Sequence, residues 1–389
     1  MKANTRIITT ALLGSLILAG GCTKTAYVHR SGPIEFASSS RGNMSTKTVY
    51  GDDLTDETTK ITRQALNWKT GDKITIASPQ APVQNDAGAT PAHASDYVVT
   101  LVKEGVPSTG SLSNADVNGL MWDENYKGKY DFYAVYPNVG ENVLSLDYSK
   151  GEFTAVIPDK QDVTGTPTTG TDPYPKSDQN ITYSKYQPDM AYAFMSAATK
   201  GVTPPEGTEK VELKFFPAFT AFEFFVSSQD EEIELTEFEI LSPEETDKLA
   251  GEFTKEAGED GDEAVPASSA TYSVKAAFPA ETKVTKDNGL NFTVFTLPVT
   301  NTGALRLRFT SKDGENATKT SRLDLKYSDK RNEDGEYVAG DDKHGTPYQF
   351  IGGHKYRIHM MKLPASQWRI TISADFDEWQ DGEEVTIYI

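Results

Sequence analysis

The sequence has a single cysteine in 389 residues and little helical patterning. Because one cysteine cannot form a disulfide within the chain, stability must come from buried apolar surface, and the length is enough for two domains. Basic residues are also scarce, since 38 Lys and Arg stand against 57 Asp and Glu and give a net charge of −19. A surface this negative repels phosphate polymers, so we expect no nucleic-acid partner.

The motifs of common enzyme classes are missing as well. The sequence contains no H-E-x-x-H, no paired C-x-x-C, no G-x-S-x-G and no G-x-x-x-x-G-K-[ST]. His354 and His359 are five residues apart on an expected strand, so they point to opposite faces and cannot share a metal. Acidic loops such as residues 123–125 lack the spacing of an EF-hand. We expect no cofactor and no metal. A hydrolase built on paired carboxylates stays open at this point, because acids are plentiful and their separation in space is not visible in the sequence. A glycosidase is a remote alternative that rests on fold analogy alone.

The N-terminal segment has the pattern of an export signal. Lys2 and Arg6 precede an apolar stretch over residues 7–19, which ends at Gly20, Gly21 and Cys22. The apolar core is too short to span a bilayer, and the pattern is typical of a secretory signal peptide. Its terminal cysteine resembles a bacterial lipoprotein signal, which implies cleavage before an acylated thiol. We therefore expect a signal peptide over 1–21 and a mature lipoprotein that begins at lipidated Cys22; an ordinary secreted protein is the alternative.

Removal of that segment makes the chain more acidic. It carries two basic residues and no acid, so the mature chain keeps 36 Lys and Arg against 57 Asp and Glu, a net charge of −21.

Apolar residues alternate with polar ones along most of the chain, and Tyr and Phe reach 18 each. Alternation with a period of two is typical of strands in sheets with one wet face. It predicts a hairpin start over residues 68–76, with a turn at Gly71 and Asp72, and strands over residues 130–136, 211–215, 220–226, 290–296, 304–309, 321–327, 353–361 and 368–376. Residues 189–198 can hold a short helix or a turn. We predict an all-β fold of β-sandwich domains with few helices.

A polar stretch near the middle of the chain predicts a domain boundary. Residues 200–208 include Pro204 and Pro205 and few apolar side chains, a composition that is common in linkers. We predict an N-terminal β-sandwich domain over 42–208 and a C-terminal one over 209–389, each of ordinary size.

Several short sequence segments, in a fixed order, resemble the fimbrillin family of Bacteroidetes, which comprises subunits of outer-membrane pili. Their order and spacing span nearly the whole mature chain, and they lie at residues 67–74 (NWKTGDKI), 130–137 (YDFYAVYP), 153–161 (FTAVIPDKQ), 189–193 (DMAYA), 213–216 (LKFF) with 220–226, and 352–356 (GGHKY). One departure is Pro217, where relatives often have His. The resemblance implies two β-sandwich domains of transthyretin-like topology and no enzyme activity.

The resemblance also implies a route of assembly. Such precursors reach the outer membrane through the lipid, and an arginine-specific protease then removes the lipidated N-terminal segment together with its first strand. The vacated place accepts a strand from another fimbrial subunit, which is β-strand addition to unpaired backbone groups beside an apolar slot. The mature protein would then belong to a cell-surface fimbrium that supports adhesion.

Residues near the N-terminus suit these roles. Ile34 and Phe36 alternate with polar or small neighbours and form the expected displaceable strand, within a propeptide over 22–41. Arg41 and Gly42 follow in a small, polar stretch that we expect to be exposed and cleaved between them. Weaker candidates for the cleavage site are Arg30 and Arg63. If no cleavage occurs, the protein keeps its anchor, as base subunits of such pili do.

The C-terminus ends in two expected strands, residues 367–376 and 384–389. Val385, Ile387 and Ile389 alternate with polar or aromatic residues and form the candidate donor strand. The same strand can instead complete the chain's own sheet, and the subunit would then accept a strand without donating one, as a tip component does.

A binding protein is the second reading of this sequence. Surface lipoproteins that capture glycans also use β-sandwiches, and they present exposed aromatic rings to sugar faces. Trp122 and Trp379 lie beside acidic residues in expected loops and are the candidates for such a glycan-binding surface.

Overall fold

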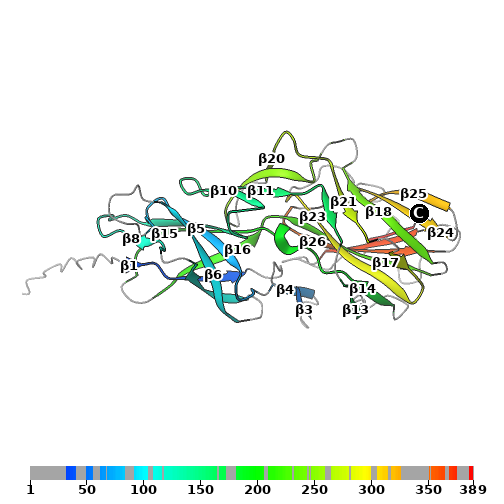
Figure 1. Ribbon diagram of the computed structural model, residues 1–389, viewed down its shortest axis with the longest axis horizontal. Coiled ribbons are helices and arrows are strands. Elements are labelled where there is room, and N and C mark those ends of the chain that lie inside the picture. The colour runs from blue at the N-terminus through cyan, green and yellow to red at the C-terminus, as the bar shows by residue number, and fades with distance from the viewer. Residues whose placement is uncertain are drawn as a thin grey trace, which may run out of the picture.

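The computed structural model describes residues 32–40, 50–55, 62–66, 68–83, 92–103, 108–115, 118–163, 166–171, 181–205, 209–229, 232–242, 245, 247–258, 264–279, 282–298, 305–313, 317–325, 350, 352–363, 368–374 and 385–388. Over these ranges the fold is all-β, as predicted, and helical structure is limited to short 3-10 turns such as η1 (Met190–Tyr192). Within the same ranges no helix has the length and hydropathy needed to cross a membrane. The molecule is elongated, with a barrel at one end and two large sheets at the other (Figure 1).

Seven strands close the barrel. In spatial order they are β15 (Met195–Val202), β16 (Val211–Pro217), β2 (Phe36–Ser40), β7 (Thr109–Asn114), β6 (Ala94–Lys103), β5 (Lys73–Ala77) and β9 (Tyr130–Tyr136). A turn leads into β5 as the sequence predicted, with Gly71 at φ +101°, where glycine is favoured. Alternation along the strands turns one face inward and fills the barrel with aromatic and aliphatic side chains.

Two large sheets form the other end. The six-stranded sheet has the order β12 (Lys160–Asp162), β21 (Ser273–Ala277), β18 (Ile233–Leu241), β24 (Arg306–Asp313) and β25 (Ala317–Asp324), with β22 (Lys283–Val284) beside β18. The seven-stranded sheet has the order β13 (Thr168–Thr171), β14 (Thr182–Lys185), β23 (Asn288–Thr296), β17 (Thr220–Ser228), β26 (Lys355–Lys362), β27 (Trp368–Ala374) and β28 (Val385–Tyr388).

The two large sheets pack face to face through aromatic rings. Phe238 of the six-stranded sheet lies 4.5 Å from Phe224 and 5.1 Å from Phe292 of the other sheet, measured between ring centroids. Phe309 and Trp368 make a further contact at 4.6 Å. Edge-to-face contacts of this kind add to the burial of apolar area and form a sandwich core.

Three smaller sheets complete the described structure. A four-stranded sheet of β10 (Val143–Asp147), β11 (Glu152–Ile157), β19 (Gly251–Glu256) and β20 (Val265–Pro266) lies along the top of the molecule in Figure 1, between the barrel and the sandwich. The two others are pairs, β1 (Gly32–Pro33) with β8 (Met121–Trp122) and β3 (Tyr50–Thr55) with β4 (Thr62–Leu66).

The strand pairing does not follow the predicted division after residue 208. β16 lies beyond that point but belongs to the barrel, whereas β12 and β14 precede it and pair with β21 and β23 of the sandwich. The polar stretch around Pro204 and Pro205 is a connection between two neighbouring barrel strands, β15 and β16. Its composition marks a surface segment, and a surface connection within one unit has the same composition as a linker.

The segment 189–198 is helical only over η1. Asp189 caps this turn, because its side chain accepts a hydrogen bond from the backbone N–H of Ala191 at 3.0 Å. The chain then continues into β15 from Met195.

Candidate functional site: the position of the N-terminal strand

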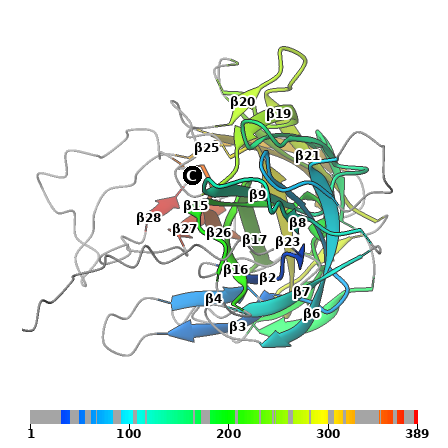
Figure 2. The same ribbon diagram turned by 90° about the vertical axis from the view of Figure 1, so that its left-hand side faces the viewer.

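β2 lies inside the barrel with a hydrogen-bonded neighbour on each side. It runs parallel to β16 from Phe36 to Ser40 and antiparallel to β7 from Phe36 to Ser39. The view along the molecule shows β2 near β16 and β7 (Figure 2). Just before the strand, Ile34 donates its N–H to the carbonyl of Leu120 at 2.9 Å. The barrel is thus closed by a strand near the start of the described chain, and without it the facing edges of β16 and β7 would hold unpaired N–H and C=O groups.

The side chains of this segment alternate between core and solvent. Ile34 is 4% exposed and Phe36 is fully buried, whereas Pro33 and Glu35 between and beside them are exposed. The Phe36 ring packs edge-on against Tyr97 and Phe132, with centroid distances of 5.2 and 5.3 Å. Phe36 is therefore the main apolar anchor of β2, since an aromatic side chain contributes the largest buried area.

β7 approaches β2 closely at a glycine. The hydroxyl of Ser38 donates to the carbonyl of Gly110 at 3.2 Å. A Cβ atom on Gly110 would lie 2.7 Å from Cγ1 of Val99 and 3.2 Å from the Ser38 hydroxyl. Glycine thus lets β2, β7 and the core side chain of β6 fit together at this point.

Tyr97 contacts Phe36 from β6 and has its own polar partner. Its hydroxyl accepts a hydrogen bond from the backbone N–H of Leu120 at 2.9 Å. Burial raises the pKa of Tyr97 to about 12, against the smaller opposing effect of this hydrogen bond. The phenol is therefore neutral at physiological pH, as a ring in an apolar barrel must be.

The predicted processing residues lie outside the described ranges, apart from Arg63. β2 ends at Ser40, directly before Arg41. Arg41, Gly42, Arg30 and Cys22 are outside the described residues. Arg63 is on β4, paired with Leu54 of β3 and apart from the barrel ladder. Cleavage between Arg41 and Gly42 would therefore break the covalent link between the segment that holds β1 and β2 and the rest of the chain.

The C-terminal strand has a different place. β28 pairs antiparallel with β27 at the edge of the seven-stranded sheet, and β27 is its one hydrogen-bonded neighbour in the described chain. Val385 stands opposite Ile372 and Ile387 opposite Ile370. Ile389 lies outside the described residues. The candidate donor strand is thus an edge strand on its own sheet.

The glycan-binding role expected for Trp122 is wrong. Trp122 is only 3% exposed, and its ring packs edge-on against Tyr130 and Phe132 at 4.7 and 5.8 Å. A buried indole cannot stack on a sugar. The alternation that places Trp122 on β8 is too short, at two residues, to be detected in the sequence. Trp379 lies outside the described residues.

The acidic loop at residues 123–125 is a hydrogen-bonded turn. The Asp123 carboxylate accepts the backbone N–H of Asn125 at 2.8 Å, and the hydroxyl of Tyr130 donates to the carbonyl of Asp123 at 3.2 Å. In the described part of the chain, no group of three or more His, Cys, Asp and Glu side chains is placed to hold a metal ion.

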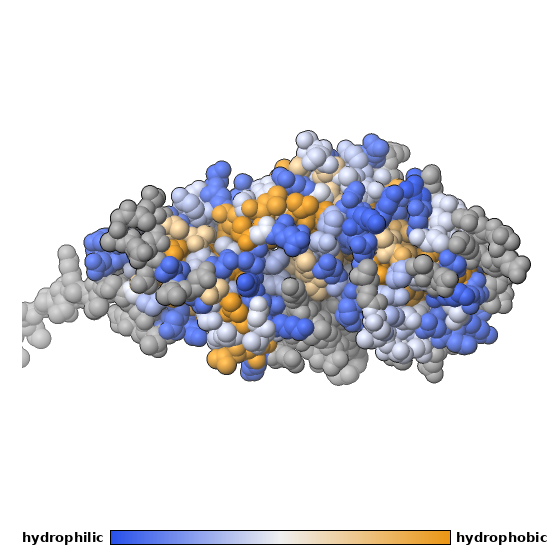
Figure 3. All heavy atoms as spheres, in the orientation of Figure 1, coloured by the Kyte–Doolittle hydropathy of each residue, from blue (hydrophilic) through white to orange (hydrophobic). Residues whose placement is uncertain are grey.

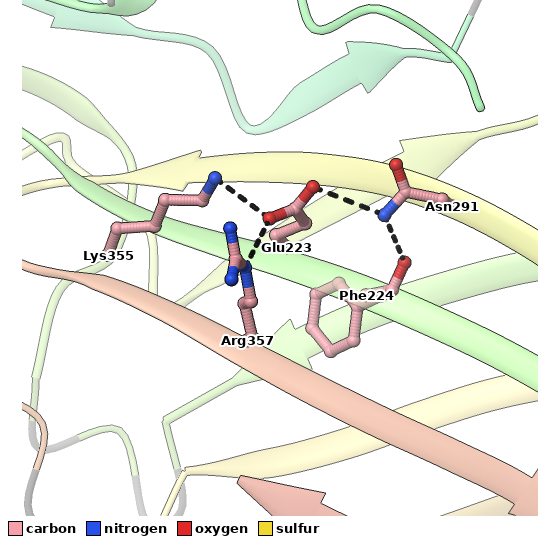
Figure 4. A network of polar contacts seen from close by, with 5 residues as sticks. All are labelled: Glu223, Phe224, Asn291, Lys355 and Arg357. Atoms are coloured by element: carbon pink, nitrogen blue, oxygen red, sulfur yellow. Dashed lines mark hydrogen bonds and ion pairs between the residues drawn. The ribbon is translucent and has the colours of Figure 1, made fainter. Parts of the chain in front are cut away.

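A buried ionic network crosses the centre of the seven-stranded sheet (Figure 4). Glu223 on β17 lies 2.8 Å from the ammonium of Lys355 and 3.1 Å from the guanidinium of Arg357, both on β26. Asn291 on β23 donates to Glu223 at 3.3 Å and to the carbonyl of Phe224 at 3.1 Å. Its residues are at most 6% exposed. The network therefore joins three adjacent strands in one register.

Glu223 is ionised despite its burial. Burial alone would raise the pKa of its carboxyl, but Lys355 and then Arg357 outweigh it and hold the pKa well below its usual range. The signal in the sequence is a lone acid inside the apolar run of residues 220–226, matched by two basic residues at alternate positions of a second strand. The sequence interpretation missed this network because it treated the acids as solvated surface charge.

Comparisons with known proteins give structural likenesses alone. No protein-family model matches the chain, and no curated protein matches it. A candidate cell adhesion protein from Bacteroides uniformis is 14% identical with a TM-score of 0.45, over 90% of this chain and 98% of the other. One from Bacteroides ovatus is 15% identical with a TM-score of 0.44, over 90% and 98%.

The tip fimbrial protein Mfa3 from Porphyromonas gingivalis, truncated at its C-terminus, is also similar. It is 10% identical with a TM-score of 0.37, over 89% of this chain and the whole of the other. At these scores the likenesses carry no argument, and the proposals that follow rest on the chain's own residues.

Proposed function

We propose that this chain is a structural subunit of a cell-surface fimbrium that supports adhesion and has no catalytic role. It is exported as a lipoprotein precursor with its lipid on Cys22, and assembly begins when an arginine-specific protease cleaves between Arg41 and Gly42. The partners are other fimbrial subunits, the outer membrane before cleavage, and the protease. The observation that carries this proposal is that β2 closes the barrel and ends at the residue before Arg41.

The position of β2 supports exchange over simple trimming of a tail. β2 is hydrogen-bonded on both sides, so its loss exposes two strand edges and the pocket of Phe36 at once. An uncleaved β2 is held at high effective concentration by the covalent chain, and no external strand competes well with it. After cleavage β2 is held by non-covalent contacts alone, and a strand with two apolar residues at alternate positions can replace it.

The C-terminal strand is the proposed donor. β28 has one neighbour in the described chain, so it leaves its sheet by breaking one ladder, whereas an internal strand must break two. Val385, Ile387 and Ile389 alternate as Ile34 and Phe36 do, and they would fill the same pockets in the next subunit. If β28 instead stays on β27, the subunit accepts a strand without donating one and is a tip component.

The test is the state of the protein recovered from cells. N-terminal sequencing should find Gly42 in the assembled form, and gels run in detergent without heating should show a ladder of oligomers. Arg41→Ala should give a monomer that begins at lipidated Cys22. Arg63→Ala removes the same charge from β4, away from the barrel ladder, and is the matched control that should keep the ladder.

The outcomes of these experiments distinguish three steps: cleavage, acceptance of a strand at the β2 position and donation of β28. A ladder that persists in Arg41→Ala with an intact N-terminus would contradict cleavage-driven assembly. Deletion of residues 385–389 should leave cleavage intact and stop chain growth if β28 is the donor. An unchanged ladder in that deletion would exclude β28 as the donor and leave the acceptor role of the β2 position in place.

A further inference from the structure

The outer face of the six-stranded sheet carries a row of charged residues in one register. Lys160 pairs with Lys275 across β12 and β21, Lys275 with Glu239 across β21 and β18, and Glu239 with Arg308 across β18 and β24. Three cations and one carboxylate thus stand side by side across four strands. In Figure 3 strongly hydrophilic residues gather over β18 and β21, on the sandwich half of the molecule.

A cavity of about 220 Å³ opens at this row, bordered by Lys160, Glu237, Lys275, Ala277 and Arg308 among others. Ala276 is buried in the core, so Ala277 on the same strand faces outward, and its small side chain leaves the space between the longer ones. One water needs only about 10–15 Å³ of such space. The cavity therefore has room for a ligand of monosaccharide size.

The charged side chains of the cavity differ in whether they have an ion-pair partner. Arg308 is paired with Glu239, whose side chain is 6% exposed, so this guanidinium is held in place by a buried partner. Lys160 is 67% exposed and lies 4.0 Å from Asp162, and Lys275 is exposed. No ion pair of the Lys275 ammonium occurs within the described ranges. The Lys275 ammonium thus lies beside one fixed guanidinium without an ion-pair partner among the described residues, and the exposed Lys160 ammonium has only the long contact with Asp162.

The net charge of the residues that line the cavity indicates which kind of anion can bind there. Lys160, Lys275 and Arg308 contribute three positive charges, and Glu237 and Glu239 contribute two negative ones, which leaves one positive charge. A phosphate dianion would be repelled by the two carboxylates. A monocarboxylate that also carries hydroxyl groups suits both, because its carboxylate binds the cations and its hydroxyls donate to Glu237.

We propose that this cavity binds a hexuronate unit, as the free acid sugar or within an acidic polysaccharide. Lys275 and Lys160 bind the carboxylate with Arg308, Glu237 accepts ring hydroxyls, and Ala277 provides the space. On a chain with net charge −19, a local excess of cations is also what lets an acidic sugar approach. The site is remote from β2 and stands whether or not strand exchange occurs.

Two probes distinguish the sources of the ligand. Ligand-observed NMR with the full-length protein should detect binding of galacturonate, with galactose and inorganic phosphate each at least about tenfold weaker, the cost of one lost charge-assisted hydrogen bond. Gel retardation in polygalacturonate tests the polymer. Retardation together with binding of the free sugar identifies a site open to chains, whereas binding of the free sugar alone identifies a monosaccharide site. Absence of binding to either probe overturns the proposal.

Substitutions distinguish specific binding in this cavity from general electrostatic attraction of the acidic sugar to the protein. Lys275→Gln should weaken galacturonate binding about tenfold or more. Ala277→Leu keeps every charge but fills the cavity, so it should abolish binding with an unchanged thermal unfolding midpoint. Lys73→Gln removes an equal charge from an exposed position on the barrel and should have no effect. Equal binding by Ala277→Leu and the unmodified protein, or equal loss in Lys275→Gln and Lys73→Gln, would overturn the proposal.

Discussion

β2 in the barrel and β17 in the seven-stranded sheet both have two hydrogen-bonded neighbours, but the two strands differ in their side-chain contacts. β2 is held by its two ladders and by Ile34 and Phe36 in an apolar core. β17 is held by its two ladders and also by the ionic contacts of Glu223 with Lys355 and Arg357. Apolar burial is non-directional, whereas a buried ionic network requires particular partners at particular positions.

This difference indicates which strand can be exchanged. Any strand with apolar residues at the positions of Ile34 and Phe36 can satisfy the β2 position, because ladder hydrogen bonds do not depend on sequence. Only a strand with an acid at the position of Glu223 can satisfy the β17 position without leaving two buried cations uncompensated. The barrel thus has a replaceable strand and the sheet a fixed one.

The largest expected loss of stability follows from a substitution in the fixed strand, β17. Glu223→Gln leaves Lys355 and Arg357 buried without their counter-charge, and we expect a loss of about 5 kcal/mol, the upper end of the range for breaking a buried pair. Urea unfolding measures the change. The triple change of Glu223→Gln with Lys355→Met and Arg357→Met removes the uncompensated charge and should recover much of the loss. Equal loss in both variants would show that shape rather than charge holds β17.

The next effect concerns the replaceable strand. Phe36→Ala leaves a cavity against Tyr97 and Phe132, and we expect a loss of about 3–5 kcal/mol in the free energy of unfolding. Deletion of residues 385–389 removes a strand with one neighbour and should cost less. A deletion that costs as much as Phe36→Ala would show that β28 is a fixed part of its sheet and would weaken its role as a donor.

The two regions should also fail at opposite ends of the pH scale. Burial raises the pKa of Tyr97 to about 12, so its contribution is complete below the unfolded value near 10 and is lost as pH rises from about 10 to about 12. We expect a loss of about 2–3 kcal/mol over this window. Denaturant melts across it should show a steeper decline for the unmodified protein than for Tyr97→Phe.

The contribution of Glu223 to the stability of the seven-stranded sheet should stay constant at pH values above the usual titration range of a glutamate. The pKa of Glu223 is held well below its usual range, so its contribution is present above the unfolded value of about 4.3 and is lost only as pH falls from there toward the folded value. Glu223→Gln should therefore remove part of the dependence of stability on acid pH and leave the dependence on alkaline pH unchanged.

Equal slopes for Tyr97→Phe and the unmodified protein above pH 10 would refute the assignment of the alkaline loss of stability to Tyr97.

Much of the fold could be predicted from alternation, and the errors have physical causes. The strand predicted over residues 130–136 matches β9, and the burial of Ile34 and Phe36 follows their spacing. Strand order could not be predicted, because alternation gives each strand a face and no neighbour. That is why β16 is assigned to the wrong unit and why the barrel closed by a strand from the chain's beginning is not visible in the sequence.

The candidate sites show the same limit. Glu223, Lys355 and Arg357 are far apart along the chain and come together only through the parallel pairing of β17 and β26. The cavity beside Lys275 depends on the register of four strands. Trp122 has an acidic neighbour, as a surface residue would, but its ring lies in the core. Composition describes single residues, whereas a site is defined by pairings between distant segments.

The smallest expected effect tests how closely the replaceable strand fits. Gly110→Ala places a Cβ 2.7 Å from Val99 and close to Ser38 of β2, so a neighbour must move. We expect a loss of about 1–3 kcal/mol, the usual cost of overpacking, and faster exchange of β2 once the chain is cleaved. Gly170→Ala on β13 is the matched control, since nothing lies within 4 Å of its added Cβ. If both variants are equally stable, the approach of β7 to β2 is looser than the geometry indicates, and the barrel can accept a wider range of donor strands than the alternation of Ile34 and Phe36 requires.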